Sequence, residues 1–190
     1  MIQIKKLLGR FYIGRSGIIL SALVIVFLFY EKIYSDNLLS DDNYRVSIAD
    51  GETVRQAVVD NRGKVVLLNL WATWCEPCVS EFPEMVALFN KYREKGLEVI
   101  TVSFDFNDRI DEDVIPFLKE QNAGFRSFIQ DENYGDQEFL EAVDKDINGV
   151  LPTTILYDRD GERRHIIQGR FDKDDLEKKI LELLIFADSK

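Results

Sequence analysis

Short apolar runs alternate with segments of helical periodicity from residue 44 to the end of the chain. Residues 64–71 and 97–104 are rich in apolar and β-prone side chains, which is typical of strands buried on both faces of a sheet. Further strands are predicted at residues 44–48, 125–130, 153–157 and 163–168. Helices are predicted at residues 52–60, 75–95, 111–121, 137–143 and 172–186.

The order of these elements predicts how the strands pair. Strands that alternate with helices pair in parallel, because the crossover helix returns the chain to the same end of the sheet. Asp160 and Gly161 form a turn dipeptide between the last two strands, which predicts an antiparallel hairpin. We therefore expect residues 44–190 to form an α/β domain with a central mixed sheet flanked by helices.

The N-terminal part of the chain has a different pattern. Residues 16–30 contain no charged side chain, and Ile33 and Tyr34 extend the apolar stretch. As a helix, residues 16–34 would span about 28 Å, which is close to the hydrocarbon thickness of a bilayer. We expect a transmembrane signal-anchor there. The alternative is a cleaved signal peptide, but Ile33-Tyr34-Ser35 is a poor match to a cleavage site of small residues.

Charge predicts the orientation of this anchor. Four cations precede it: Lys5, Lys6, Arg10 and Arg15. They favour a cytoplasmic N-terminus at residues 1–15. The polar residues 35–43 are expected to form a linker. The chain is therefore expected to be a single-pass protein of the cell membrane whose domain lies on the extracytoplasmic, periplasmic side. Disulfides persist in that compartment. The net charge of the chain is −10, so a nucleic acid, whose backbone such an acidic body would repel, is excluded as a partner.

The chain contains two cysteines, Cys75 and Cys78. A bond between them closes a very small loop and constrains little of the unfolded chain, so we expect a chemical role. Cys75 falls at the predicted start of a helix, where the helix dipole favours a thiolate, although the negative charge of Glu76 opposes this. Cys78 lies one turn later and can attack a mixed disulfide formed by Cys75. Pro77 is tolerated in a first helical turn.

A Cys-x-x-Cys pair is also half of a zinc or iron–sulfur site, which needs about four ligands. The chain has no third cysteine, and its one histidine, His165, follows Cys78 by 87 residues. We therefore expect no metal and no cofactor, and a surface position for His165 on the last strand.

The stretch from Trp71 to Pro83, WATWCEPCVSEFP, resembles the active site of the TlpA/ResA group of membrane-anchored thioredoxin-like proteins. The resemblance covers about residues 46–187. It implies a thioredoxin-like fold with an extra strand–helix insertion between Phe104 and Gly149. It also implies reduction of disulfides in apocytochrome c or other exported proteins, with electrons from a membrane reductant of the CcdA or DsbD type.

The same resemblance implies roles for residues around the cysteines. Pro152 would be a cis-proline facing them, and the backbone of Leu151 would pair with an extended substrate segment. Trp74 would shape the surface presented to a partner. Glu81, if buried, would exchange protons with the thiols, because Asn69 replaces the buried aspartate of thioredoxins. The alternatives are an ordinary proline before a strand and a solvated glutamate that favours the helix dipole.

Other functions remain open on the same fold. The motif does not fix the direction of electron flow, so a disulfide oxidase or isomerase is an alternative. A thiol peroxidase normally carries a Thr-x-x-Cys motif, which is missing around Cys78. A copper chaperone would use a wider cysteine spacing together with a histidine, and His165 comes after the proline loop, where such a ligand is not expected.

Overall fold

The computed structural model describes residue 44 and residues 46–186. The N-terminus, signal-anchor and linker expected at residues 1–43 lie outside the described residues. Within the described range, no helix combines the length and the hydropathy needed to cross a membrane.

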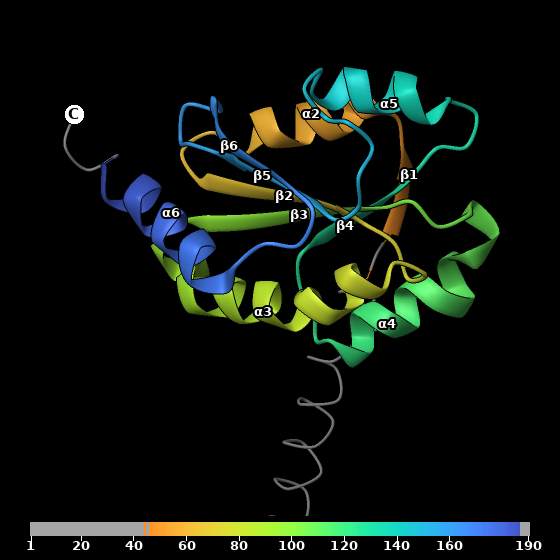
Figure 1. Ribbon diagram of the computed structural model, residues 1–190, viewed down its shortest axis with the longest axis horizontal. Coiled ribbons are helices and arrows are strands. Elements are labelled where there is room, and N and C mark those ends of the chain that lie inside the picture. Colours follow the sequence, from red (N-terminus) through yellow and green to blue (C-terminus); the bar gives the residue numbers. More distant parts are fainter. Residues whose placement is uncertain (1–43, 45, 187–190) are drawn as a thin grey trace, which may run out of the picture. The chain divides into compact units, whose positions relative to one another are not determined.

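Six strands form one mixed sheet (Figure 1). They are β1 (Val46–Ala49), β2 (Val65–Trp71), β3 (Leu97–Ser103), β4 (Arg126–Gln130), β5 (Thr153–Tyr157) and β6 (Arg163–Gln168). Their order across the sheet is β1-β4-β3-β2-β5-β6. The first four strands in that order pair in parallel, while β5 pairs antiparallel with both β2 and β6. The expected mixed sheet with a terminal hairpin is therefore confirmed.

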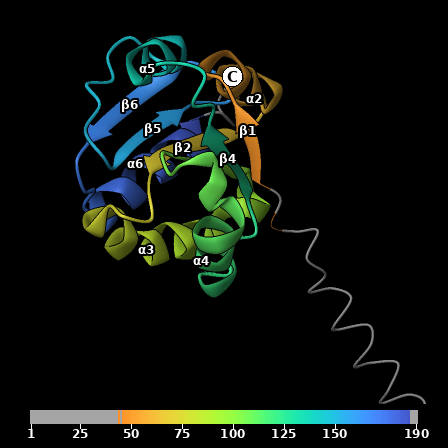
Figure 2. The same cartoon turned by 90° about the vertical axis from the view of Figure 1, so that its right-hand side faces the viewer.

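Helices cover both faces of the sheet (Figures 1 and 2). They are α2 (Gly51–Asp60), α3 (Glu76–Tyr92), α4 (Ile115–Glu120), α5 (Asp136–Val143) and α6 (Lys173–Phe186). On one face lie α2 and α5, and on the other lie α3, α4 and α6. The strand–helix unit expected between Phe104 and Gly149 is present as β4 and α5, and β4 is inserted between β1 and β3.

The central strand β2 is buried along its whole length. Leu67 and Trp71 contribute to the apolar layer under α3, α4 and α6, whereas Leu68 and Leu70 contribute to the layer under α2 and α5. Successive side chains of a strand point to opposite faces, so a run without polar alternation suits a sheet covered on both sides. This placement fixes the C-terminal end of β2, from which the cysteine motif begins.

The boundaries of the helices differ from the prediction for local reasons. Helix α2 begins at Gly51 because the Asp50 carboxylate accepts a hydrogen bond from the Thr53 N–H at 2.7 Å and caps it. The helix predicted at residues 111–121 is divided into a π turn (Ile110–Val114) and α4, and a 3₁₀ turn (Asn107–Arg109) precedes it. Pro116 lies in the first turn of α4 and has no N–H for a bond to an earlier carbonyl.

Candidate active site

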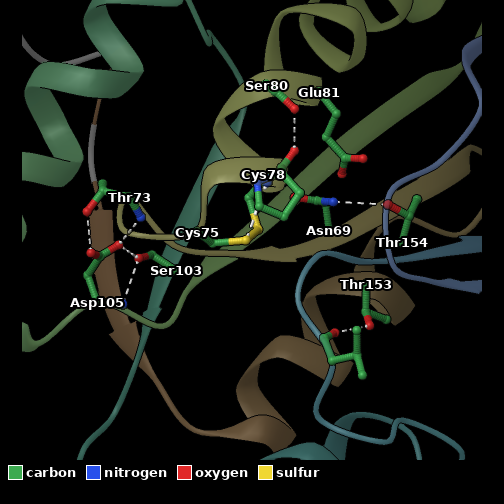
Figure 3. The surroundings of a disulfide bond; sticks show 12 residues. Asn69, Thr73, Cys75, Cys78, Ser80, Glu81, Ser103, Asp105, Thr153 and Thr154 are labelled. Carbon is green, nitrogen blue, oxygen red and sulfur yellow. Dashed lines mark hydrogen bonds between the residues drawn. A yellow bond between two sulfur atoms is a disulfide. The ribbon is translucent and has the colours of Figure 1, made fainter.

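Cys75 and Cys78 lie where β2 meets α3 and are joined by a disulfide, with their Cα atoms 5.2 Å apart (Figure 3). Cys75 is the N-cap of α3, and its Sγ accepts a hydrogen bond from the Cys78 N–H at 3.3 Å. The other N–H groups of the first turn have no carbonyl partner within the helix, so this position favours negative charge on sulfur. Pro77 lies in that first turn, as expected.

Glu81 lies one turn beyond Cys78 on α3 and is buried. Burial raises the pKa of its carboxyl group to about 7, against the opposing effect of the hydrogen bond from the Phe171 N–H and of the neighbouring Asn69 amide. The Phe171 N–H donates to Oε2 at 3.1 Å, while Oε1 has no partner among the described residues. The solvated glutamate considered as an alternative is therefore wrong. At neutral pH this group populates both protonation states, which proton exchange requires.

Asn69 occupies a buried position on β2 beside this carboxyl group (Figure 3). Its Nδ2 donates a hydrogen bond to Thr154 Oγ1 on β5 at 3.0 Å. An amide does not titrate, so Glu81 is the buried titratable group at this point of the sheet.

The peptide bond between Leu151 and Pro152 is cis, as the resemblance implies. The Pro152 carbonyl accepts a hydrogen bond from the Gly169 N–H at 2.8 Å, which ties this segment to the end of β6. Thr153 Oγ1 donates to the Val150 carbonyl at 2.6 Å. The N–H and C=O of Leu151 have no hydrogen-bond partner among the described residues, so this piece of backbone remains open to pairing.

The two tryptophans of the motif have different surroundings. Trp71 is fully buried and packs against Phe82 and Phe117, with ring centroids 4.7 and 4.9 Å apart. Trp74 is exposed and lines a cleft of about 860 Å³ together with Cys75 and Leu151. The cleft thus brings Trp74 and Leu151, two of the three residues predicted for substrate contact, together with Cys75, whereas Pro152 and Cys78 do not line it.

Asp105 is a site residue that the sequence analysis did not identify. It is buried just after β3, and its carboxylate accepts hydrogen bonds from the Thr73 N–H at 2.9 Å and from the Thr73 hydroxyl at 2.5 Å (Figure 3). The Ser103 hydroxyl donates to the same carboxylate at 2.5 Å. These bonds hold the turn that presents Cys75. The signal was available, since parallel neighbouring strands bring their C-terminal ends together.

His165 is half-buried on β6, opposite Leu156, and does not line the cleft. Burial lowers the pKa of its imidazole. Across the described residues, no cluster of three or more His, Cys, Asp or Glu side chains is arranged to hold a metal ion.

Comparisons with known proteins agree with this geometry. Residues 42–166 match the model of the AhpC/TSA family. Thiol-disulfide oxidoreductase ResA of Oceanobacillus iheyensis is 33% identical over 184 residues, which cover 91% of this chain and 88% of the relative. This chain belongs to the AhpC/TSA family, among the ResA-type thiol–disulfide oxidoreductases.

Solved structures support the same assignment for the fold. A Chlorobium tepidum structure described as thiol:disulfide interchange protein DsbE has 33% identity and a TM-score of 0.56, covering 67% of this ResA-type chain and 84% of that chain. The thioredoxin domain of a thiol-disulfide oxidoreductase from Bacteroides vulgatus has 26% identity and a TM-score of 0.54, covering 66% of this chain and 83% of that chain. Membership of this group implies that the substrates are disulfide-containing proteins.

Proposed function

We propose that this protein is an extracytoplasmic reductase of disulfides in exported proteins, working through a dithiol–disulfide cycle of Cys75 and Cys78. The observation that carries the proposal is the Cys75–Cys78 disulfide at the N-terminus of α3, with Cys75 on the cleft and Cys78 behind it. In such a cycle the observed disulfide is the state that remains after a substrate has been reduced.

Cys75 is the attacking residue. Its residue exposure is 6%, against 1% for Cys78, and only Cys75 lines the cleft among the two. As a thiolate, Cys75 attacks one sulfur of the substrate disulfide, a mixed disulfide forms, and the other substrate sulfur leaves as a thiolate. Cys78 then loses its proton and attacks Cys75 Sγ, which closes the Cys75–Cys78 bond and releases the second substrate sulfur. Two electrons pass to the substrate, and the two released thiolates take up protons.

Glu81 accepts the proton that Cys78 must lose in the second step. Its position one turn beyond Cys78 on the same helix face and its half-ionised state near pH 7 support this role. Glu76 is exposed next to Cys75 and opposes its ionisation, whereas Trp74, Leu151 and the cis Pro152 form the substrate side of the site.

The location and the partners of the protein follow from the expected signal-anchor at residues 16–34. We propose that it holds the domain on the outer side of the cell membrane, where exported proteins with disulfides, such as apocytochrome c, are the substrates. A membrane thiol reductant of the CcdA or DsbD type returns two electrons to the Cys75–Cys78 disulfide. The family relationship supports disulfide-containing protein substrates for such a cycle.

A trapping experiment tests this proposal. A full-length Cys78→Ser variant expressed in cells retains Cys75 but has no resolving thiol, so it accumulates as mixed disulfides that mass spectrometry of non-reduced bands identifies. Recovery of exported proteins, apocytochrome c among them, supports the proposal, and a Cys75→Ser variant is the control that traps nothing through Cys75. Recovery of cytoplasmic proteins alone contradicts the location. A wild-type protein that does not interconvert between dithiol and disulfide in a redox buffer contradicts the activity.

A further inference from the structure

The cleft beside Cys75 extends well beyond the residues that the proposed reaction uses. It also runs along the loop after β3, which contributes Phe106, and the loop after β4, which contributes Glu132 and Tyr134. The end of the cleft at Cys75 performs the chemistry. The opposite wall is built by the insertion that contains β4 and α5, and no step of the cycle assigns it a task.

Exposed apolar side chains concentrate on this cleft. Six large hydrophobic side chains are exposed in the described part of the chain, and four of them line the cleft. Their exposed fractions are 65% for Trp74, 69% for Phe106, 37% for Tyr134 and 46% for Val150. Apolar groups gathered in one exposed place mark an interaction surface, and aromatic residues are enriched at the centres of such surfaces.

The charge of the cleft has one sign. Four carboxyl groups line it, from Glu76, Asp105, Glu132 and Asp136, and the described residues that line it include no Lys, Arg or His. Two of these groups belong to the far wall and are held in place. Glu132 Oε1 accepts a hydrogen bond from the Asn107 N–H at 2.5 Å, and Asp136 Oδ1 accepts one from Gln130 Nε2 at 3.0 Å.

Each of these two carboxylates keeps a second oxygen without a hydrogen bond from a described residue. Their negative charges are thus fixed beside the aromatic side chains before any partner binds. A positive side chain of a partner meets both a carboxylate and an aromatic face there. Little conformational entropy is lost on binding, because the carboxylates are already ordered.

The backbone near Pro152 indicates the form of the partner. Val150 already uses its N–H for Asn148 Oδ1 at 3.1 Å and its C=O for Thr153 Oγ1 at 2.6 Å. Leu151, which lines the same cleft, has neither group bonded within the described range. An extended segment can therefore pair with the backbone of Leu151. A folded domain can do so only if it has a strand edge without a hydrogen-bonded neighbour.

The geometry points to a substrate preference: the favoured partner is an extended, unfolded segment whose cysteine reaches Cys75 and whose neighbouring side chains are cationic and aromatic. The Lys or Arg side chains lie against Glu132 and Asp136, and the aromatic side chains lie against Phe106 and Tyr134. Segments with acidic residues around the cysteine are disfavoured, because the carboxyl groups that line the cleft repel them. This inference rests on the proposed function, since it concerns the substrates of the same cysteine.

Matched peptides test the preference. The full-length reduced protein in detergent is mixed with peptides that each contain one internal disulfide and one Trp, and that differ only in flanking Lys, Ser or Glu residues. Acid quenching and chromatography of the peptide thiols give the second-order rate constant. We expect the order Lys, then Ser, then Glu, with a change of about threefold for each charge that meets one exposed carboxylate. The difference shrinks with added salt, because salt screens exposed charges.

Variants assign the preference to the far wall. Glu132→Gln keeps the acceptor for the Asn107 N–H but removes the charge, so it slows reduction of the Lys peptide about threefold relative to the Ser peptide. The matched control is Glu94→Gln, which removes an exposed charge from outside the cleft and changes neither rate. Phe106→Ala slows reduction of all three Trp-containing peptides. It has a smaller effect on otherwise identical peptides in which Ser replaces the Trp.

Two outcomes separate this inference from the proposed function. Equal rates for the Lys, Ser and Glu peptides, or an equal effect of Glu94→Gln and Glu132→Gln, overturn the preference while the reductase activity stands. If the wild-type protein reduces neither the peptides nor insulin, the proposed function is overturned, and the preference with it.

Discussion

The chemistry of the site depends on three side chains that follow β2: Cys75, Cys78 and Glu81. All three are buried, but their surroundings have opposite effects on the ionisation of Cys75 and of Glu81. The N-terminus of α3 favours negative charge on Cys75, whereas burial disfavours it on Glu81 and raises the pKa of that carboxyl group to about 7. One group is thus prepared to attack near neutral pH, and the other is prepared to take or return a proton there.

The first prediction concerns the reaction rate of a Glu81→Gln variant. Gln keeps the shape of the side chain and an acceptor for the Phe171 N–H, but it does not titrate. We expect the thiol titration of Cys78 to shift downward, because a neighbouring carboxylate disfavours a thiolate, and the rate of insulin reduction to lose its inflection near pH 7. Iodoacetamide alkylation rates across pH measure the first effect and turbidity the second. An unchanged titration curve would remove Glu81 from the proton-transfer step.

The second prediction concerns stability and has a definite sign. The ordinary pKa of a glutamate is 4.5, and in the folded protein it is raised to about 7. Between these values the folded state holds a proton that the unfolded state has released, so folding stability falls as pH rises from 4.5 to about 7 and then levels off. Urea unfolding of wild type and Glu81→Gln across this range measures it, and the variant should gain stability relative to wild type as pH rises. The control Glu94→Gln should show no such trend.

The third prediction concerns Asp105, which holds Thr73 before the attacking cysteine. Hydrogen bonds to a charged group contribute about 1.5–3 kcal/mol each. We expect Asp105→Asn and Thr73→Val each to reduce the free energy of unfolding, and the double variant to lose less than the sum of the two. Because the turn presents Cys75, both variants should also lower kcat/KM for insulin. Strict additivity in the double-mutant cycle would show that the two side chains act independently.

For single residues, the sequence predicted the features that depend on neighbours in the chain. The order of Cys75, Pro77 and Cys78 along one helical turn was sufficient to place them at a helix N-terminus, because capping depends on neighbours in the chain. Asp105 was not predicted, because its contact with Thr73 joins residues 32 positions apart, and only the parallel pairing of β2 and β3 indicates that contact. The burial of Glu81 likewise depends on Phe171, which is 90 positions away.

The elements of the sheet differ greatly in how much they contribute to stability. Leu68 on β2 is fully buried between the central strands, whereas Ile48 on the edge strand β1 is about half exposed. We expect Leu68→Ala to cost about 2–5 kcal/mol of unfolding free energy, because it leaves a cavity, and Ile48→Ala to cost less than about 0.5 kcal/mol. Urea titration of the two variants compares them. Equal losses would contradict the assignment of β2 to the buried centre.

Most elements were predictable from the sequence because their patterns are strong. The buried runs of β2 and β3 and the hairpin of β5 and β6 need no information beyond apolar runs and a turn at Gly161, whose φ is +79°. Residues 111–121 were predicted as one helix, but a π turn (Ile110–Val114) and α4 follow one another there. Helical periodicity indicates which face is apolar, but it does not reveal that Pro116 prevents one continuous hydrogen-bond ladder.

For the whole molecule, the arrangement of layers decides where reaction is possible. The C-terminal ends of the parallel strands β2, β3 and β4 carry the loops that line the cleft, while the helices cover the two faces of the sheet. Ligands bind at this end in open parallel sheets because the loops there are free to vary while the strands hold them in place. The fold therefore leaves Cys75 open to a partner on that edge and encloses Cys78 and Glu81.

The last prediction concerns the direction of electron flow, which is a property of the folded molecule in both redox states. The Cys75–Cys78 bond closes so small a loop that it barely restricts the unfolded chain. The stability difference between the oxidised and reduced protein therefore reports how the fold itself favours one state, and about 30 mV of potential corresponds to about 1.4 kcal/mol. A reductase requires the folded protein to favour the disulfide, with a potential near that of thioredoxin at about −270 mV rather than that of a strong oxidant at about −120 mV.

We expect the oxidised form to unfold at a higher guanidinium concentration than the form kept reduced with dithiothreitol. Equilibration with glutathione buffers should give a consistent potential. A reduced form that is the more stable of the two would mean that the same cysteines introduce disulfides into their partners.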